Sequence, residues 1–176
     1  MMRSSCSLGL CKLYESDDPR APALEAWLQA DSASAYAHLG YPDMARSELA
    51  AAWDAWQPPH ENDRGGLEWV TALVERDLGR IDVAERLAAS SVRHWGATGN
   101  RRDAALPAIT LAELHVMAGE PRGLAMAKTV IDTVALLHSV RAHERLEPLA
   151  VALEARRSSD ARDLAHRARQ VSAVRA

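Results

Sequence analysis

The fold is decided by residues 67–95, which read LEWVTALVERDLGRIDVAERLAASSVRHW. The first half of this stretch places apolar or small residues at the i, i+3, i+4, i+7, i+11 spacing of one helical face, at Leu67, Val70, Thr71, Val74 and Leu78. Gly79 follows and readily takes the left-handed conformation that ends a helix. A second stripe then runs through Ala84, Leu87, Ala88, Ser91, Val92 and Trp95. The stretch therefore predicts two amphipathic helices joined by a tight bend.

This hairpin recurs along the chain with a period of 39 to 40 residues. A shift of 39 aligns Gly40 with Gly79 and Trp56 with Trp95, and a shift of 40 takes Gly79 to Gly119. The matched glycines predict equivalent bends between paired helices, because each falls at the end of an apolar stripe. The sequence therefore predicts an all-α fold of about four antiparallel helix pairs.

The same phasing sets the expected limits of the domain. In the last unit Ser158 replaces the glycine and can cap the final helix. Pro107 and Pro148 fall inside helical patterns, and each is expected to start or kink its helix. We expect a helical-repeat domain over residues 22–176, preceded by an N-terminal remnant or partial cap helix over residues 1–21.

The composition fits a helical protein and excludes several classes of function. Of the 176 residues, 48% are hydrophobic and 26% are charged, and there is no phenylalanine. A net charge of −3 argues against binding nucleic acid through bulk positive charge, so we expect no direct nucleic-acid contact. No stretch approaches the roughly 20 apolar residues that cross a bilayer. We expect a cytoplasmic protein with no membrane partner.

No motif in the sequence indicates an enzyme, a cofactor or a metal site. The phosphate-binding and nucleophile motifs Gly-x-x-x-x-Gly-Lys, Gly-x-Gly-x-x-Gly and Gly-x-Ser-x-Gly do not occur. Cys6 and Cys11 lack the spacing of a zinc-ligand pair. His138 and His143 are five residues apart and fall on different helical faces. We therefore expect a non-enzymatic protein without metal ligands or a cofactor.

The decisive stretch resembles a known repeat. Its pattern Leu67-x2-Val70-Thr71-x2-Val74, followed by Gly79 and then Ala84-x3-Ala88, is similar to the tetratricopeptide repeat. The period here is longer than the roughly 34 residues of that repeat, and HEAT-like pairs have periods nearer to it. The resemblance implies a right-handed α-solenoid, and the repeat subtype stays open.

A second resemblance lies in the C-terminal half. The stretches Leu136-Leu137-His138-Ser139-Val140-Arg141-Ala142 and Arg145-Leu146-x-Pro148-Leu149 resemble the C-terminal part of actinobacterial transcriptional regulators. These carry an N-terminal helix-turn-helix of the XRE type and a helical-repeat sensor. The resemblance covers roughly residues 20–176 and implies a ligand-sensing module that lacks the DNA-binding part.

The candidate binding residues follow from the repeat. In stacked helix pairs the first helices line a concave surface that binds partners. The corresponding positions are Glu68, Glu75, Arg76, His115, Arg145 and Arg156. The Trp69 side chain lies about opposite the apolar stripe, and it either contacts a neighbouring repeat or faces the groove. Acidic groups at one end and arginines at the other could hold an extended peptide of opposite polarity.

These observations predict a binding module for a peptide or protein, with two alternatives for its role. One is the sensing part of a transcriptional regulator, which shifts between packings when its groove is filled. The other is a free-standing scaffold that assembles other proteins. An uncovered edge at the first repeat, with Leu8, Leu10 and Leu13, could also support a homodimer.

Overall fold

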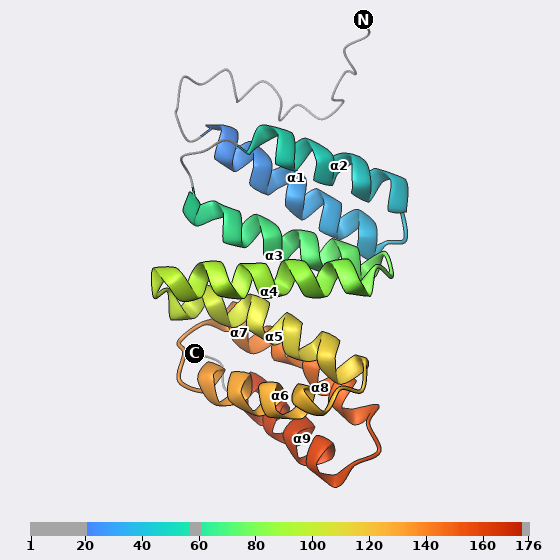
Figure 1. Cartoon of the computed structure of the whole chain (residues 1–176), viewed down its shortest axis with the longest axis vertical. Coiled ribbons are helices and arrows are strands. Elements are labelled where there is room, and N and C mark those ends of the chain that lie inside the picture. Colours follow the sequence, from blue (N-terminus) through green and yellow to red (C-terminus); the bar gives the residue numbers. More distant parts are fainter. Residues whose placement is uncertain (1–20, 57–60, 174–176) are drawn as a thin grey trace, which may run out of the picture.

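The computed structural model describes residues 21–56 and 61–173, and every regular element within them is an α-helix (Figure 1). This confirms the all-α prediction. The expectations for the N-terminal remnant, for the dimer edge at Leu8, Leu10 and Leu13, and for Cys6 and Cys11 lie outside the described residues.

The helices are stacked along the long axis of the molecule, from α1 and α2 at one end to α9 at the other (Figure 1). They are α1 (Ala21–His38), α2 (Pro42–Ala55), α3 (Glu61–Asp77), α4 (Ile81–Thr98), α5 (Arg101–Met117), α6 (Pro121–Val134), α7 (Val140–Glu144), α8 (Leu146–Glu154) and α9 (Ser159–Ala173). Consecutive helices pack as pairs: α1 with α2, α3 with α4, α5 with α6, and α8 with α9.

The bends within the first three pairs are equivalent, as the glycine phasing predicts. Gly40, Gly79 and Gly119 have φ of 80°, 78° and 79°, a left-handed conformation that glycine adopts without a steric penalty. At each bend the next residue's N–H reaches back five residues, as in the 2.8 Å bond from Arg80 N to Glu75 O. This is the Schellman pattern of helix C-termini.

The fourth pair uses the predicted serine instead. The Ser158 hydroxyl accepts a hydrogen bond from the Ala161 N–H at 3.2 Å and so caps α9. Pro148 lies in the first turn of α8, as expected. Helix α5 runs through Pro107 without ending, since buried contacts along most of its length support it.

Small residues let the paired helices approach closely. Ser91 of α4 donates a hydrogen bond to the Gly65 carbonyl of α3 at 2.6 Å. A Cβ placed on Gly123 of α6 would lie 2.8 Å from the backbone of His115 in α5. Ala84 and Ala88 are also fully buried. Larger side chains at these crossings would hold the helices apart.

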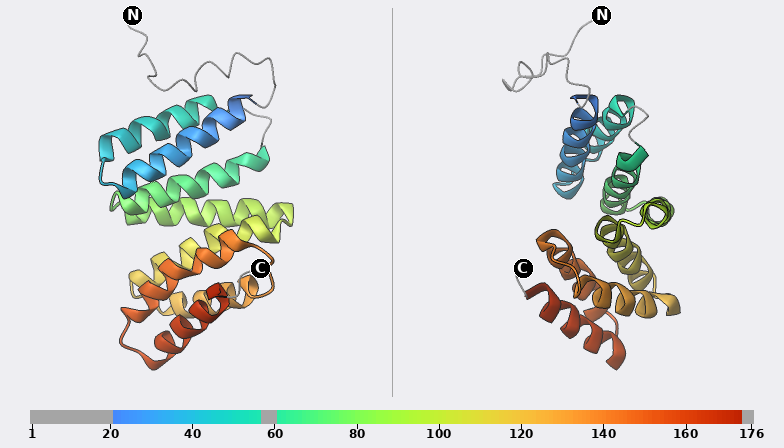
Figure 2. Two further views of the ribbon diagram at one scale, coloured as in Figure 1. Left: turned by 180° about the vertical axis from the view of Figure 1, so that it is seen from behind. Right: turned by 90° about the vertical axis from the view of Figure 1, so that its left-hand side faces the viewer.

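Helix α5 is the central element of the fold. Every side chain from Leu106 to Val116 is buried, except that of Ala108, which is half-buried. It contacts α4, α6 and α8, and to a lesser extent α3 and α7. In the right-hand view of Figure 2 the stack is bent, with α4 on the outer side and with α1 and α8 on the inner side. The polar groups of α5 must therefore find partners on neighbouring helices.

Candidate binding site

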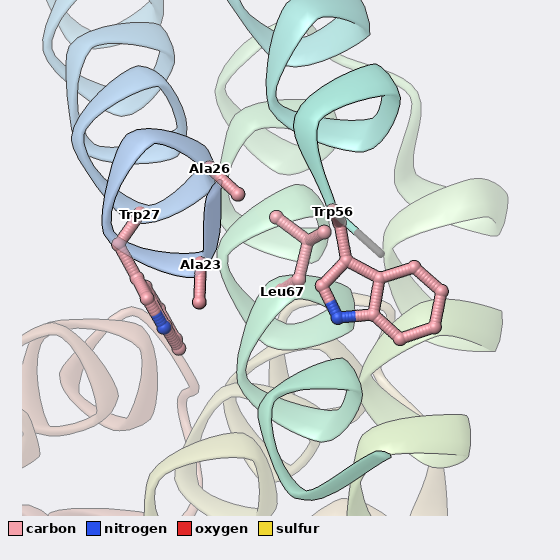
Figure 3. Close-up of a pocket in the computed structure, with 5 residues that line it drawn as sticks. All are labelled: Ala23, Ala26, Trp27, Trp56 and Leu67. Carbon is pink, nitrogen blue, oxygen red and sulfur yellow. The ribbon is translucent and has the colours of Figure 1, made fainter. Parts of the chain in front are cut away.

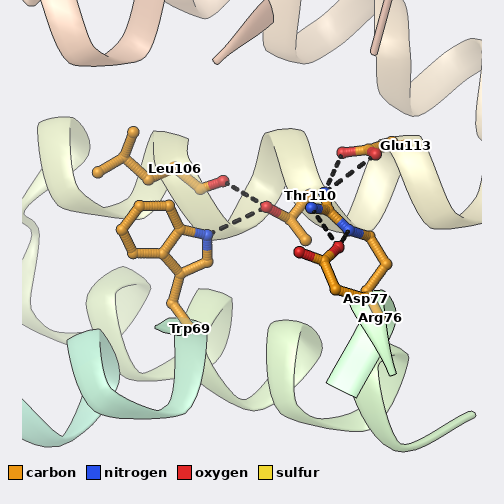
Figure 4. Close-up of polar contacts among 6 residues, drawn as sticks. All are labelled: Trp69, Arg76, Asp77, Leu106, Thr110 and Glu113. Carbon is orange, nitrogen blue, oxygen red and sulfur yellow. Dashed lines mark hydrogen bonds and ion pairs between the residues drawn. The ribbon is translucent and has the colours of Figure 1, made fainter. Parts of the chain in front are cut away.

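A polar cluster joins α3 to α5 where the second and third helix pairs meet. Trp69 is 4% exposed, and its indole Nε1–H donates to the Thr110 hydroxyl at 3.0 Å. That hydroxyl in turn donates to the Leu106 carbonyl at 3.3 Å (Figure 4). The sequence left two places open for Trp69, and the structure shows that it contacts the neighbouring unit.

One helical turn further along α5, an ion pair makes the second link. The Arg76 Nη1 donates to both carboxylate oxygens of Glu113, at 3.1 Å and 3.2 Å, and Arg76 also pairs with Asp77 at 2.8 Å (Figure 4). Burial raises the pKa of the Glu113 carboxyl, and the charges of Arg76 and Arg145 only partly oppose this rise.

The α7–α8 segment adds two arginines to this cluster. The guanidinium carbon of Arg141 lies 4.9 Å from the centroid of the Trp69 ring, and that of Arg145 lies 6.0 Å from it. Both distances suit a cation–π contact. Burial lowers the pKa of the Arg145 guanidinium, and the nearby charge of Arg76 lowers it further. We call the set Trp69, Arg76, Thr110, Glu113, Arg141 and Arg145 the junction cluster.

Arg145 is the group in this cluster that has buried donor atoms without a partner among the described residues. Its Nε and Nη2 atoms are buried and have no hydrogen-bond partner within the described residues. A guanidinium away from water normally pairs with an anion or a carbonyl, because desolvating its charge is costly. The three arginines face two carboxylates, those of Glu113 and Asp77. This excess of positive charge can accept one further carboxylate.

The structure thus brings together three of the seven residues predicted from the sequence, Trp69, Arg76 and Arg145. Glu68 and Glu75 are buried on α3 but pair locally. The Glu68 carboxylate accepts from Arg64 at 3.1 Å, and Glu75 pairs with Arg80.

The remaining two predicted residues lie elsewhere. His115 is two positions beyond Glu113, about 200° around α5, and therefore faces α4 rather than α3. Arg156 lies over the bend at Gly119 and donates to its carbonyl at 3.4 Å. Neither contributes to the junction cluster.

Sequence reasoning missed Thr110, Glu113 and Arg141. A signal for the first two exists: they are polar residues within an otherwise apolar stretch of α5, where each must find a partner inside the protein. Arg141 lies on the five-residue helix α7, which is too short to show a periodic pattern.

A separate apolar hollow lies between α1, α2 and α3 (Figure 3). It is lined by Ala23, Ala26, Trp27, Trp56 and Leu67. The space is too narrow to admit a water molecule, so it offers no room for a ligand in this conformation.

One group of described residues has the chemistry of a metal site. It comprises Glu85, His115 and Glu120, whose ligand atoms lie within 4.8 Å of one another.

No described helix is both long enough and apolar enough to cross a membrane.

The chain matches no protein-family model, no curated protein and no solved structure.

Proposed function

We propose that the chain is a non-enzymatic helical-repeat domain, a right-handed α-solenoid of the tetratricopeptide-like type, that binds a peptide or protein partner. The three equivalent glycine bends support the repeat, since they recur at the period read from the sequence. Stacked hairpins of this kind offer a continuous inner surface to an extended partner.

The observation that carries the binding proposal is that the Nε and Nη2 donors of Arg145 are buried without a hydrogen-bond partner among the described residues. Its buried donors lie beside the Trp69 ring and close to Arg76 and Arg141. A carboxylate from a partner would accept hydrogen bonds from these donors and offset the excess positive charge. The partner therefore presents an acidic side chain or a free C-terminus at the junction cluster.

Such a partner would act on the packing of the stack. The junction cluster draws side chains from α3, α5 and the α7–α8 segment, so an anion held there contacts the second, third and fourth helix pairs together. A ligand that favours one arrangement of these pairs shifts the population toward it. This coupling suits the sensing part of a transcriptional regulator, and it is the role that we propose.

The proposal is tested with an array of peptides of random sequence, each synthesised with a free C-terminal carboxylate and as its amide. Peptides that bind the purified chain are then titrated calorimetrically against wild type, Arg145→Gln and Arg157→Gln. Arg157 is exposed on the loop between α8 and α9 and serves as the matched control.

We expect Arg145→Gln to weaken binding at least tenfold, since the loss of one partner of a buried charge pair costs about 2 to 5 kcal/mol. The control should leave the affinity unchanged. Equal affinity of wild type and Arg145→Gln for every selected peptide would contradict the proposal.

A further inference from the structure

His115 is a buried imidazole held between two carboxylates. It is 3% exposed, and it comes from α5, near the bend that leads to α6. Its Nδ1 lies 3.0 Å from Glu120 Oε2, and its Nε2 lies 3.8 Å from Glu85 Oε1. Glu85 belongs to α4, so the ring connects the second helix pair to the third.

From this geometry we propose that Glu85, His115 and Glu120 bind a divalent transition-metal ion such as Zn²⁺. The three residues each offer one ligand atom, and these atoms lie within 4.8 Å of one another. Imidazole nitrogen and carboxylate oxygen bind Zn²⁺ at about 2.0 to 2.2 Å in a tetrahedral arrangement, so two ligands of one ion lie about 3.4 Å apart. A movement of about 1 Å by the glutamate side chains is sufficient to close the site.

The orientation of the histidine ring is already fixed. Its two nitrogens face carboxylate oxygens of different glutamates, Nδ1 that of Glu120 and Nε2 that of Glu85. Burial of the ring restricts its rotation further.

The charge balance also favours a cation. Glu85 and Glu120 together carry two negative charges when ionised, and the cation beside them is the guanidinium of Arg122. Its Nη2 lies 3.1 Å from Glu85 Oε1, and its Nε bonds to Glu120. The Arg122 side chain is 61% exposed, so it can swing into solvent at little cost when an ion enters. Arg122 is therefore a competitor for the site, and its removal should strengthen metal binding.

The test uses the full chain with Cys6→Ser and Cys11→Ser in every sample, which removes thiols that bind zinc. Metal-free protein is titrated with Zn²⁺ by calorimetry, and with Co²⁺ by visible absorption. The samples are the parent chain, Glu85→Gln, His115→Gln, Glu120→Gln, Arg122→Ala and the control His166→Gln. His166 is an exposed histidine on α9.

We expect one ion per chain in the parent, at least tenfold weaker binding in the three ligand variants, and unchanged binding in the control. Arg122→Ala should bind several-fold more tightly. Zinc should also raise the melting temperature of the parent chain and not that of Glu85→Gln, because a ligand that binds only the folded state stabilises it.

Circular dichroism of the metal-free variants separates loss of the site from loss of the fold. Glu85 and Glu120 are only half-buried, so their glutamine variants keep the fold even if His115→Gln does not. Absence of binding in the parent, or binding that survives in both Glu85→Gln and Glu120→Gln, would overturn the proposal. In that case the histidine serves only as a partner for the two carboxylates.

Discussion

At the scale of single residues, the contact between Trp69 and Thr110 is the neutral link between α3 and α5. Thr110→Val keeps the shape of the side chain and removes the acceptor of the Trp69 N–H. A buried donor without an acceptor costs about 1 to 3 kcal/mol. We therefore expect the free energy of unfolding to fall by that amount in urea denaturation. In the background of Trp69→Phe, which has no indole N–H, Thr110→Val should cost less than it does in wild type. Equal costs in the two backgrounds would contradict the link.

The charged link predicts a dependence on pH. Because burial raises the pKa of Glu113, its stabilising contribution is complete below its unfolded pKa and is lost as the pH rises through its folded pKa. The variant Glu113→Gln does not titrate and is the reference. We expect the free energy of unfolding of wild type, relative to this variant, to fall as the pH rises above about 4, the ordinary range of a glutamate pKa in the unfolded chain.

Urea denaturation at matched pH values measures this difference. A rise in the relative stability of wild type over the same range would show that Arg76 and Arg145 outweigh burial, and would contradict the prediction.

Arg145 gives a third prediction at this scale. Its charge is desolvated, and two of its donor atoms lack partners within the described residues. Arg145 therefore lowers the stability of the free protein, and a bound partner would compensate for this cost. We expect Arg145→Gln to unfold at the same or a higher urea concentration than wild type. A large loss of stability would show that Arg145 supports the fold itself.

The sequence identified some of these residues and not others for a physical reason. Helical periodicity gives the angle of a side chain around its own helix, which placed Trp69 away from the apolar stripe. It does not give the position of the neighbouring helix, which decides whether that side is buried. Glu113 and His115 are two positions apart on α5, and they contact different helices. Only the packing of α5 against α3 and α4 shows that Glu113 faces α3 and that His115 faces α4.

At the scale of the helix, the sequence is more informative, because bends and caps depend on local conformation. The glycine bends and the Ser158 cap are confirmed, since each requires a residue type that few others can replace. The sequence pattern did not predict the break between α7 and α8 at Arg145. The only sign of it was Pro148, which was expected to start or kink a helix.

Two glycines within helices offer a matched test of the close crossings. Gly96 lies in α4, and a Cβ added there would have nothing within 4 Å, so Gly96→Ala should stabilise the protein by about 0.5 to 1 kcal/mol. At Gly123 the added methyl meets the backbone of α5 at 2.8 Å, so Gly123→Ala should destabilise it despite the same gain in helix propensity. Thermal unfolding of both variants checks the opposite signs.

At the scale of the whole molecule, each helix pair contacts chiefly its neighbours along the stack. Leu149 of α8 is fully buried against the central core cluster, and Leu149→Ala should cost about 2 to 5 kcal/mol. In native-state hydrogen exchange, this loss should appear in the amides of α5, α8 and α9 and leave those of α1 and α2 unchanged, because coupling between stacked units decays with distance. Equal loss of protection in all helices would contradict this view.

The three identical bends have a consequence for how the chain can change in length. Deleting residues 80–119 would join Gly79 directly to Glu120 and Pro121, and the new junction would have the same local sequence as the bend it replaces, Gly119-Glu120-Pro121. Because Gly79 and Gly119 share the same left-handed backbone conformation, removing or duplicating this stretch, which holds α4 and α5, keeps the geometry of the bend. Removing or adding such a two-helix segment therefore needs no new type of bend.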